Sequence, residues 1–257
     1  MYSQSRVLDS VRSTREMLLP HWGNVPERMK NGSAHSVVTG LDLAVERYLA
    51  GELKKIDSGA EFAGEEYGGR RDADRFWLCD PIDGTAHFVR GLPFCSVMLA
   101  LIEDGRVNFS AIYDFIKDDM YHASRGQGAF RNSEPIHVSD RPLEHSYISL
   151  ETRIDKPVNF DLMRRMRESS VLFSSITSGY EFSLVASGKL EARVCVDPWA
   201  KDWDVAPGSL LVEEAGGIVA NIGSASYDYR DLNMIAGNPL VYRALTEGPK
   251  AIFPLTS

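Results

Sequence analysis

One stretch of the chain, residues 76–91, constrains the fold more than any other part of the sequence. It begins with four apolar residues, as a buried strand does, and then places Asp80 and Asp83 on either side of a proline. Gly84 and Thr85 follow and open a short apolar-spaced segment, which predicts a turn into a helix. Carboxylates at a strand end bind hard cations, and the first backbone N–H groups of a helix bind anions. The stretch therefore predicts a cation site beside an anion site, which is the arrangement of metal-assisted phosphate chemistry.

The composition narrows the classes of partner. The formal net charge of −8, from 36 acidic residues against 28 lysines and arginines, argues against a broad surface for nucleic acid or anionic membranes. No apolar run approaches the roughly 20 residues of a transmembrane helix, and the N-terminus lacks the apolar region of a signal peptide. We therefore expect a cytoplasmic protein that binds neither nucleic acid nor membranes.

The three cysteines, Cys79, Cys95 and Cys195, lie far apart in apolar or strand-like runs. The sequence contains no C-x-x-C pair, which a zinc or redox site would favour. We expect all three to be reduced residues of the core.

The first half of the chain predicts an α+β arrangement. Apolar spacings of three and four residues predict a helix over about residues 4–21 and a second helix after Thr39, its N-cap, with Asp42 in the first turn. On its own, Asp42 is typical of an acid that complements the helix dipole. Strands are predicted over residues 61–64, 76–79, 94–103, 107–113 and 120–123, with a hairpin turn at Asp104 and Gly105 and another turn into a strand over residues 125–130. Two helices and a largely antiparallel meander follow from this pattern.

The second half predicts alternating strands and helices. Pro135 and Pro142 bracket a change in composition, and we divide the chain there into residues 1–135 and 136–257. The first part is expected to carry most metal ligands and the second to carry Asp204 and the substrate specificity. Predicted strands cover residues 147–150, 171–173, 192–196, 218–220 and 234–236, and predicted helices cover 159–167, 178–186, 205–215 and a short segment at the end.

Several acids stand at the ends of these elements, where functional sites collect. Glu65 follows a strand, Asp80 and Asp83 follow another, and Asp204 precedes a helix. Taken singly, Glu65 with Glu66 is typical of a solvated loop and Asp204 of an N-cap. Taken together, oxygen ligands without cysteine or histidine favour Mg²⁺ or Mn²⁺ over Zn²⁺.

Four ordered motifs resemble those of the inositol monophosphatase family. Residues 77–85, with Phe88 and residues 91–93 after them, are similar to its signature. The other matches are residues 38–42 with Glu46, residues 64–66, and residues 203–206 with 214–217. The resemblance covers essentially the whole chain. It implies a layered α-β-α-β-α sandwich of two subdomains and Mg²⁺-dependent hydrolysis of phosphate monoesters, commonly sensitive to lithium.

The resemblance also assigns metal ligands, for two to three Mg²⁺ ions. It implies that the first ion is bound by Glu65, Asp80 and the Ile82 carbonyl. The second ion would be bound by Asp80, Asp83 and Asp204, so that Asp80 bridges the two. Glu65 would also position a more weakly held third ion and its water.

The remaining implied roles concern water and substrate. Thr85, paired with Asp42, would orient the nucleophilic water, with Glu65 as the third catalytic residue. The backbone N–H groups of Gly84 and Thr85 would hold the phosphate. The implied substrate-binding set is Asp83, Gly84, Thr85, Ser178, Asp197 and Asp204. Asp197 lies seven residues before Asp204, where inositol-type enzymes bind sugar hydroxyls with a carboxylate, although a turn-forming role is the alternative.

The sequence departs from the family pattern at three places. His87 stands where the family usually has Asn, and it is either a structural residue or a substrate contact. Ser36 replaces an acid that usually lies three residues before Thr39. The lysine found in the preceding loop of many members is either Lys30 or missing. The network that positions water is therefore less firmly predicted than the metal site.

Inositol 1-phosphate is the first substrate that we expect, because it is the commonest in the family. Histidinol phosphate is second, because residues 43–47, 64–69 and 88–91 are similar to that branch, although Ser178 replaces an acid often found there. Fructose 1,6-bisphosphate and nucleotide 2′- or 3′-phosphates come third. A non-catalytic regulatory member is the alternative from a different class. The only partners we expect are a small phosphorylated metabolite and, by family analogy, a second copy of the chain.

Overall fold

The computed structural model describes residues 2–25, 28–29 and 37–255. Lys30 and Ser36, which the sequence analysis named, lie outside these residues.

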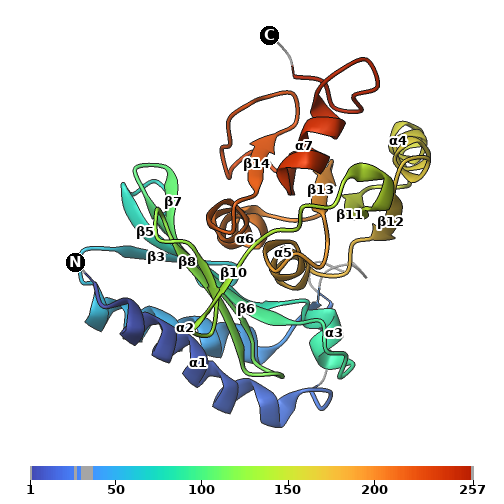
Figure 1. The fold of residues 1–257 in the computed structure, drawn as a ribbon. Coiled ribbons are helices and arrows are strands. Elements are labelled where there is room, and N and C mark those ends of the chain that lie inside the picture. Colours follow the sequence, from blue (N-terminus) through green and yellow to red (C-terminus); the bar gives the residue numbers. More distant parts are fainter. Residues whose placement is uncertain (1, 26–27, 30–36, 256–257) are drawn as a thin grey trace.

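The molecule consists of five layers, which Figure 1 shows edge-on. Helices α1 (Gln4–Leu18) and α2 (Gly40–Ile56) cover one face of an eight-stranded sheet. Helices α5 (Ser178–Ala186) and α6 (Asp202–Glu214) lie between that sheet and a five-stranded sheet. Helices α4 (Pro157–Arg167) and α7 (Pro239–Thr246) pack on the outer face of the second sheet. The α-β-α-β-α sandwich expected from the sequence is confirmed.

The eight-stranded sheet has the order β10-β9-β8-β7-β6-β5-β3-β4. Strands β3 and β5 are parallel, and the other neighbouring strands are antiparallel. This is the predicted meander, with two short edge strands, β4 and β10, that the sequence analysis missed. The bounds are β3 Glu61–Gly64, β4 Gly68–Gly69, β5 Arg75–Asp83, β6 Ser96–Glu103, β7 Arg106–Asp114, β8 Asp119–Ser124, β9 Ala129–Arg131 and β10 Glu134–Ile136.

The five-stranded sheet has the order β12-β11-β13-β15-β14. Strand β11 is parallel to β12 and β13, whereas β15 is antiparallel to β13 and β14. Two residues each of β1 (Arg28–Met29) and β2 (Val37–Val38) form a separate ladder. The bounds are β11 Tyr147–Thr152, β12 Val171–Ser174, β13 Ala192–Val196, β14 Ile218–Asn221 and β15 Met234–Gly237, and the short helices are η1 Leu19–His21, α3 Thr85–Val89 and η3 Leu143–His145.

Strand β5 is longer than predicted. The sequence analysis ended it at Cys79, because aspartate and proline are rare inside strands. In the structure Asp80 pairs with Met98 and Asp83 pairs with Ser96, with a register shift between the two pairs. An irregularity of this kind accommodates Pro81, which has no N–H group for the ladder, and re-aims side chains at a strand end. Both acids therefore belong to the strand and project from a rigid element.

Helix α6 begins earlier than predicted, at Asp202, and its N-cap is Lys201. Asp204 is therefore the third residue of the helix and not its N-cap. Its Oδ2 accepts a hydrogen bond from the Lys201 N–H group at 2.6 Å, as in the reverse half of a capping box. The first turn of α6 thus fixes the Asp204 carboxylate.

Two further expectations bear on the core and on membranes. Cys79, Cys95 and Cys195 are free and buried, as predicted. Within residues 2–25, 28–29 and 37–255, no helix is long and apolar enough to cross a membrane.

Candidate active site

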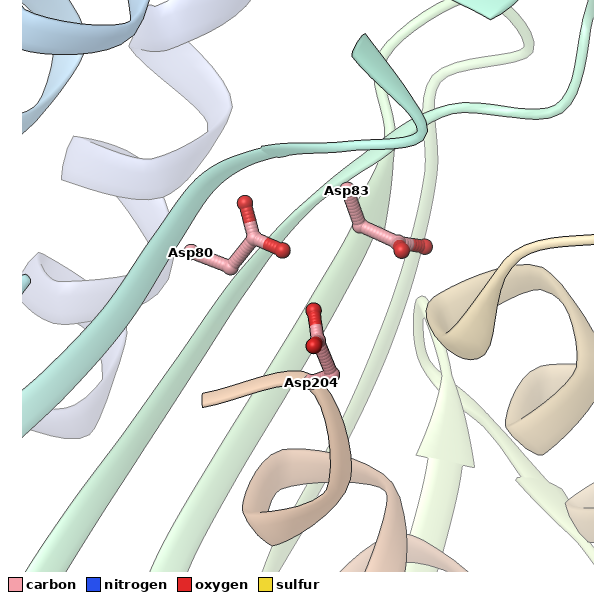
Figure 2. Close-up of side chains that lie close together, drawn as sticks. All are labelled: Asp80, Asp83 and Asp204. Atoms are coloured by element: carbon pink, nitrogen blue, oxygen red, sulfur yellow. The ribbon is translucent and has the colours of Figure 1, made fainter. Parts of the chain in front are cut away.

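Three carboxylates from the two halves of the chain meet at one point. Asp80, Asp83 and Asp204 each offer an oxygen atom, and these atoms all lie within 4.8 Å of one another. Figure 2 shows Asp80 and Asp83 on β5 and Asp204 in the first turn of α6, with the three side chains close together. Asp80 and Asp83 are buried, and Asp204 is half-buried. The structure therefore brings together three of the metal ligands predicted from the sequence; these three residues are called the metal cluster below.

Burial raises the pKa of all three carboxyl groups, and repulsion by neighbouring acids adds to the increase for Asp80 and Asp204. Burial is the main cause of the raised pKa of Asp80, which lies well above its usual range, and the charges of Glu65 and Asp204 add to it. Burial, with the charge of Asp83, raises the pKa of Asp204 to about 7. Burial also raises the pKa of Asp83 to about 6, against the opposing N–H group of Gly179 and the charge of Arg193. A divalent cation removes this repulsion, so an oxygen-only donor set of this kind fits Mg²⁺ or Mn²⁺.

Glu65 lies at the same sheet edge as Asp80. Strands β3 and β5 are parallel, and Gly64 is opposite Cys79, so each acid directly follows a member of this pair. Glu65 is half-buried and is not among the three carboxylates that meet within 4.8 Å. Its charge nevertheless contributes to the raised pKa of Asp80, which indicates that the two carboxylates are near neighbours. The predicted role of Glu65 as a ligand stays a prediction.

Glu46 fixes the loop that carries Glu65. Its two carboxylate oxygens accept hydrogen bonds from the N–H groups of Glu66, at 3.0 Å, and of Tyr67. Burial is the main cause that raises the pKa of Glu46 to about 7. A Cβ atom on Gly64 would lie 2.3 Å from Glu46 Oε1, so a larger residue there would displace the Glu46 carboxylate. The sequence analysis included Glu46 only as a motif member, and the structure shows how it positions the loop.

Thr85 and Asp42 form the predicted pair. The Thr85 hydroxyl lies 2.9 Å from the Ile82 carbonyl oxygen and 3.4 Å from Asp42 Oδ1. Asp42 Oδ2 accepts two hydrogen bonds from Thr39, one from its N–H group and one from its hydroxyl, each at 2.7 Å. Burial raises the pKa of Asp42 to about 6, chiefly against these two hydrogen bonds. Asp42 is therefore both part of the capping box of α2, as its position suggested, and a partner of Thr85.

Gly84 forms the turn between the metal cluster and α3. Its φ of 81° is left-handed, and a Cβ atom would lie 2.4 Å from the Phe94 carbonyl oxygen. Only glycine therefore fits this position without moving backbone. The turn places the first N–H groups of α3 directly after Asp83, and N–H groups at a helix start have no partner within the helix. Their predicted use, holding a phosphate, stays a prediction.

Ser178 reaches the site through its backbone. The N–H groups of Ser178 and Gly179 donate to the two oxygens of Asp83, at 3.2 and 2.8 Å. The Ser178 hydroxyl instead accepts a hydrogen bond from Arg193 at 2.9 Å. The structure thus joins Ser178 to Asp83, and the predicted contact with substrate stays a prediction.

Asp197 and His87 have contacts that suit structural roles. Asp197 has a φ of 49°, typical of a turn, and its Oδ2 accepts hydrogen bonds from Lys156 at 2.5 Å and Asn159 at 3.2 Å. These hydrogen bonds, led by the one from Lys156, lower the pKa of Asp197. The His87 ring meets Phe94 edge-on at 5.9 Å, and its Nδ1 is buried without a hydrogen-bond partner. Contacts of either residue with substrate remain predictions.

The sequence analysis missed a buried ionic cluster behind Asp83. Arg193 has no exposed surface, and its guanidinium contacts the carboxylates of Glu151 and Glu181. The available signal was a single arginine inside the otherwise apolar strand β13, since a charge buried there requires a partner. These three residues are called the arginine cluster below.

Comparison with known proteins agrees with the geometry. A model of the inositol monophosphatase family matches residues 7–251. A fructose-1,6-bisphosphatase/inositol-1-monophosphatase of Thermotoga maritima is 31% identical over 237 residues, which cover 90% of each chain. An inositol monophosphatase of Dictyostelium discoideum is 30% identical over 261 residues, covering 96% of this chain and 94% of the relative. The solved structure of a Thermotoga maritima inositol monophosphatase (IMPase) matches with a TM-score of 0.83 and 29% identity, over 91% of both chains.

Proposed function

Because the chain belongs to the inositol monophosphatase family and is a phosphatase of that family, we propose that it hydrolyses inositol 1-phosphate or a similar polyol or sugar phosphate with Mg²⁺. The observation that carries this proposal is the metal cluster, in which three acidic side chains from two halves of the chain lie within 4.8 Å. Buried carboxylates are retained in such proximity where a cation compensates their charge.

Asp80, Asp83 and Asp204 hold the metal, with Glu65 and the carbonyl of Ile82 completing the set. When bound, Mg²⁺ lowers the pKa of water and stabilises the charge of the leaving oxygen. Mn²⁺, which has similar ligand preferences, is expected to substitute.

The other residues orient the reactants. The Thr85 hydroxyl donates a hydrogen bond to the Ile82 carbonyl or to Asp42. Its oxygen is therefore free to accept a hydrogen bond from the attacking water. Asp42 is itself held by Thr39, so the direction of this bond is fixed. The N–H groups of Gly84 and Thr85 hold the phosphate and follow Asp83 directly. Positioning of this kind supplies a large part of the rate in phosphate hydrolysis.

Inositol 1-phosphate is placed first because relatives that match over nine tenths of the chain carry that activity in their names. The double name of the Thermotoga relative supports including fructose 1,6-bisphosphate among the candidates. Histidinol phosphate is the second candidate, on the similarity of residues 43–47, 64–69 and 88–91 to that branch. The sequence keeps all four of the predicted ligand carboxylates, those of Glu65, Asp80, Asp83 and Asp204. Their presence argues against a non-catalytic member.

Phosphate release from a panel of substrates tests the proposal. The panel comprises inositol 1-phosphate, histidinol phosphate, fructose 1,6-bisphosphate and 3′-phosphoadenosine 5′-phosphate, each with Mg²⁺, with Mn²⁺ and with EDTA. We expect turnover with either metal, none with EDTA, inhibition by Li⁺, and the highest kcat/KM for inositol 1-phosphate. Undiminished turnover in EDTA would exclude the metal, and a higher kcat/KM for another ester would exclude inositol 1-phosphate as the preferred substrate.

Two organisational proposals accompany the activity. We propose a homodimer, by analogy with the family, which light scattering after size-exclusion chromatography tests directly. We also propose that residues 1–135 and 136–257 are the two subdomains, with specificity in the second. Exchange of residues 136–257 for those of a relative with another substrate is then expected to move the substrate preference with the exchanged part.

A further inference from the structure

Arg193 lies at the centre of the second half, in strand β13, with no exposed surface. Its guanidinium contacts two carboxylates, those of Glu151 and Glu181. The same group donates hydrogen bonds to two hydroxyls, those of Ser175 at 3.1 Å and Ser178 at 2.9 Å. A planar guanidinium has several N–H donors in fixed directions and can bind these four side chains at once, whereas a lysine ammonium cannot.

One set of these contacts connects Arg193 to Asp83 through the start of α5. The segment 175–178 enters α5, and the N–H groups of Ser178 and Gly179 at the start of that helix donate to the two Asp83 oxygens. Arg193 holds the segment through the two serine hydroxyls. Glu181, the ion-pair partner of Arg193, holds it again by accepting hydrogen bonds from the Ile176 N–H group and the Ser175 hydroxyl. The arginine cluster thus fixes the donors that orient Asp83.

A second set of contacts connects Arg193 to Asp204 through Glu151 and the backbone before α6. Oε1 of Glu151 accepts hydrogen bonds from the N–H groups of Trp199 and Ala200, at 2.9 and 2.8 Å. The next N–H group in the chain, that of Lys201, donates to Asp204 Oδ2 at 2.6 Å. Arg193 binds Oε2 of the same Glu151 side chain. The backbone that leads into α6 and orients Asp204 is therefore tied to the same guanidinium.

We propose that Arg193 is a positioning residue for the metal, because it holds the segments 175–178 and 199–201 so that Asp83 and Asp204 face a common cation. The inference rests on the proposed function, which supplies the cation. Arg193 touches neither substrate nor metal in this account. It acts through backbone N–H groups that donate to two ligands from different halves of the chain.

A purely structural role for the arginine cluster predicts a different result. In that case loss of Arg193 lowers stability but leaves the affinity of the folded protein for Mg²⁺ unchanged. The matched control is Arg141, which pairs with the fully buried carboxylate of Glu191 beside the start of β13. The contacts of Arg141 and Glu191 run to Ser139, Tyr147 and Gly188 and not to either segment.

The experiment compares Arg193→Gln, Arg193→Lys and Arg141→Gln with the unchanged protein. Folding is checked by circular dichroism, and Mg²⁺ affinity is measured by calorimetric titration below each melting temperature, with Mn²⁺ binding followed by electron paramagnetic resonance. We expect Arg193→Gln to weaken metal binding by about tenfold or more, the range for residues that orient metal ligands. Arg193→Lys restores part of the loss, and Arg141→Gln binds metal as the unchanged protein does.

The expected kinetic signature is a larger Mg²⁺ concentration for half-maximal activity in Arg193→Gln, with KM for the phosphate ester changed less. Unchanged Mg²⁺ affinity in folded Arg193→Gln overturns the inference, and so does an equal loss in Arg141→Gln. If Arg193→Gln does not fold, Glu151→Ala replaces it, since it removes the acceptor of the Trp199 and Ala200 N–H groups at a partly exposed side chain and leaves the Arg193–Glu181 pair in place. Unchanged affinity in that variant also overturns the inference. Failure of the unchanged protein to bind Mg²⁺ overturns the proposed function as well, which separates the two failures.

Discussion

Buried carboxylates occur in two clusters of this protein, and the clusters differ in what compensates their charge. In the arginine cluster, Glu151 and Glu181 share the guanidinium of Arg193. In the metal cluster, the charge of Asp83 raises the pKa of both Asp80 and Asp204. The N–H groups of Ser178 and Gly179 and the charge of Arg193 compensate the charge of Asp83 only in part, since its pKa is still raised to about 6.

The difference is between acids whose charge is compensated by a partner in the same chain and acids whose charge is not. A charge buried together with its partner in the same chain is satisfied as soon as the chain folds. Acids that repel one another lower the stability of the folded protein until a cation binds to them. We therefore expect such a group of acids where the bound cation has a function. The position of Arg193 between the two clusters links them, since its hydrogen bonds extend to the donors of Asp83.

The strongest test of this contrast is Asp83→Asn, which removes one charge of the metal cluster but keeps an acceptor for one of the two N–H groups of Ser178 and Gly179. We expect kcat to fall by about 10²–10³-fold or more, the effect of removing one electrostatic group from an active site. Phosphate release under saturating Mg²⁺ measures it. Asp119→Asn, at a buried acid that pairs with Arg131, is the matched control, with a far smaller loss. Activity that survives both Asp83→Asn and EDTA would refute the metal site.

The reverse test removes the compensating charge from the arginine cluster. Arg193→Gln leaves Glu151 and Glu181 facing each other without the guanidinium, and loss of one partner from a buried ion pair costs about 3–5 kcal/mol. Urea unfolding in the presence of EDTA measures this cost apart from any metal effect. A loss below about 1 kcal/mol would place the pair among exposed ion pairs in strength and remove the contrast between the two clusters.

Asp204→Asn is expected to act in the opposite direction on stability. It removes an anion from the metal cluster, while the amide oxygen still accepts the Lys201 N–H bond of α6. In EDTA we expect the free energy of unfolding to rise by about 1 kcal/mol at pH 8, although metal binding and activity are lost. Thermal or urea unfolding with and without Mg²⁺ checks both parts. A destabilised metal-free variant would show that repulsion at this position is negligible, and full turnover would show that Asp204 is not a ligand.

The pH dependence of the metal-free protein gives the smallest of these effects. Burial raises the pKa of Asp83 to about 6 and that of Asp204 to about 7 in the folded state, above the value near 4 of an unfolded chain. The folded state then binds more protons than the unfolded state between about pH 4 and 7, so this contribution to stability falls as pH rises through that window. In EDTA we expect the melting temperature to drop by about 2 °C or more from pH 5 to pH 8. Saturating Mg²⁺ is expected to abolish the drop, and an equal drop with Mg²⁺ would attribute it to other groups.

The two clusters also differ in how far the sequence predicts them. Asp80 and Asp83 can be recognised because a strand pattern ends in two acids and a turn. Asp204 can be recognised because its motif follows the others in the order that the family has. Local pattern points to these acids singly, and the resemblance to the family joins them into one predicted ligand set. The layered fold was likewise implied by the resemblance, whose motifs span the chain.

The arginine cluster was missed because its contacts are between residues distant in the sequence. Glu151 and Arg193 lie on neighbouring parallel strands, and Glu181 on the helix between the two sheets. No local pattern pairs them. The early end given to β5 has a similar cause, because the pairing of Asp80 with Met98 overrides the low strand propensity of Asp and Pro. Sequence reasoning therefore reached the three clustered aspartates but not the buried arginine cluster behind them.

The middle layer of helices has a practical consequence for dissecting the molecule. The apolar side chains of α5 and α6 are buried in one continuous cluster with residues of both sheets, so a break in residues 137–146 would leave each fragment with an open apolar face. Each fragment would therefore be stable in water only when it is bound to the other. Since Asp83 and Asp204 would then come from separate polypeptides, restored phosphatase turnover would report their reassembly, and the chain offers a natural starting point for a split-enzyme sensor.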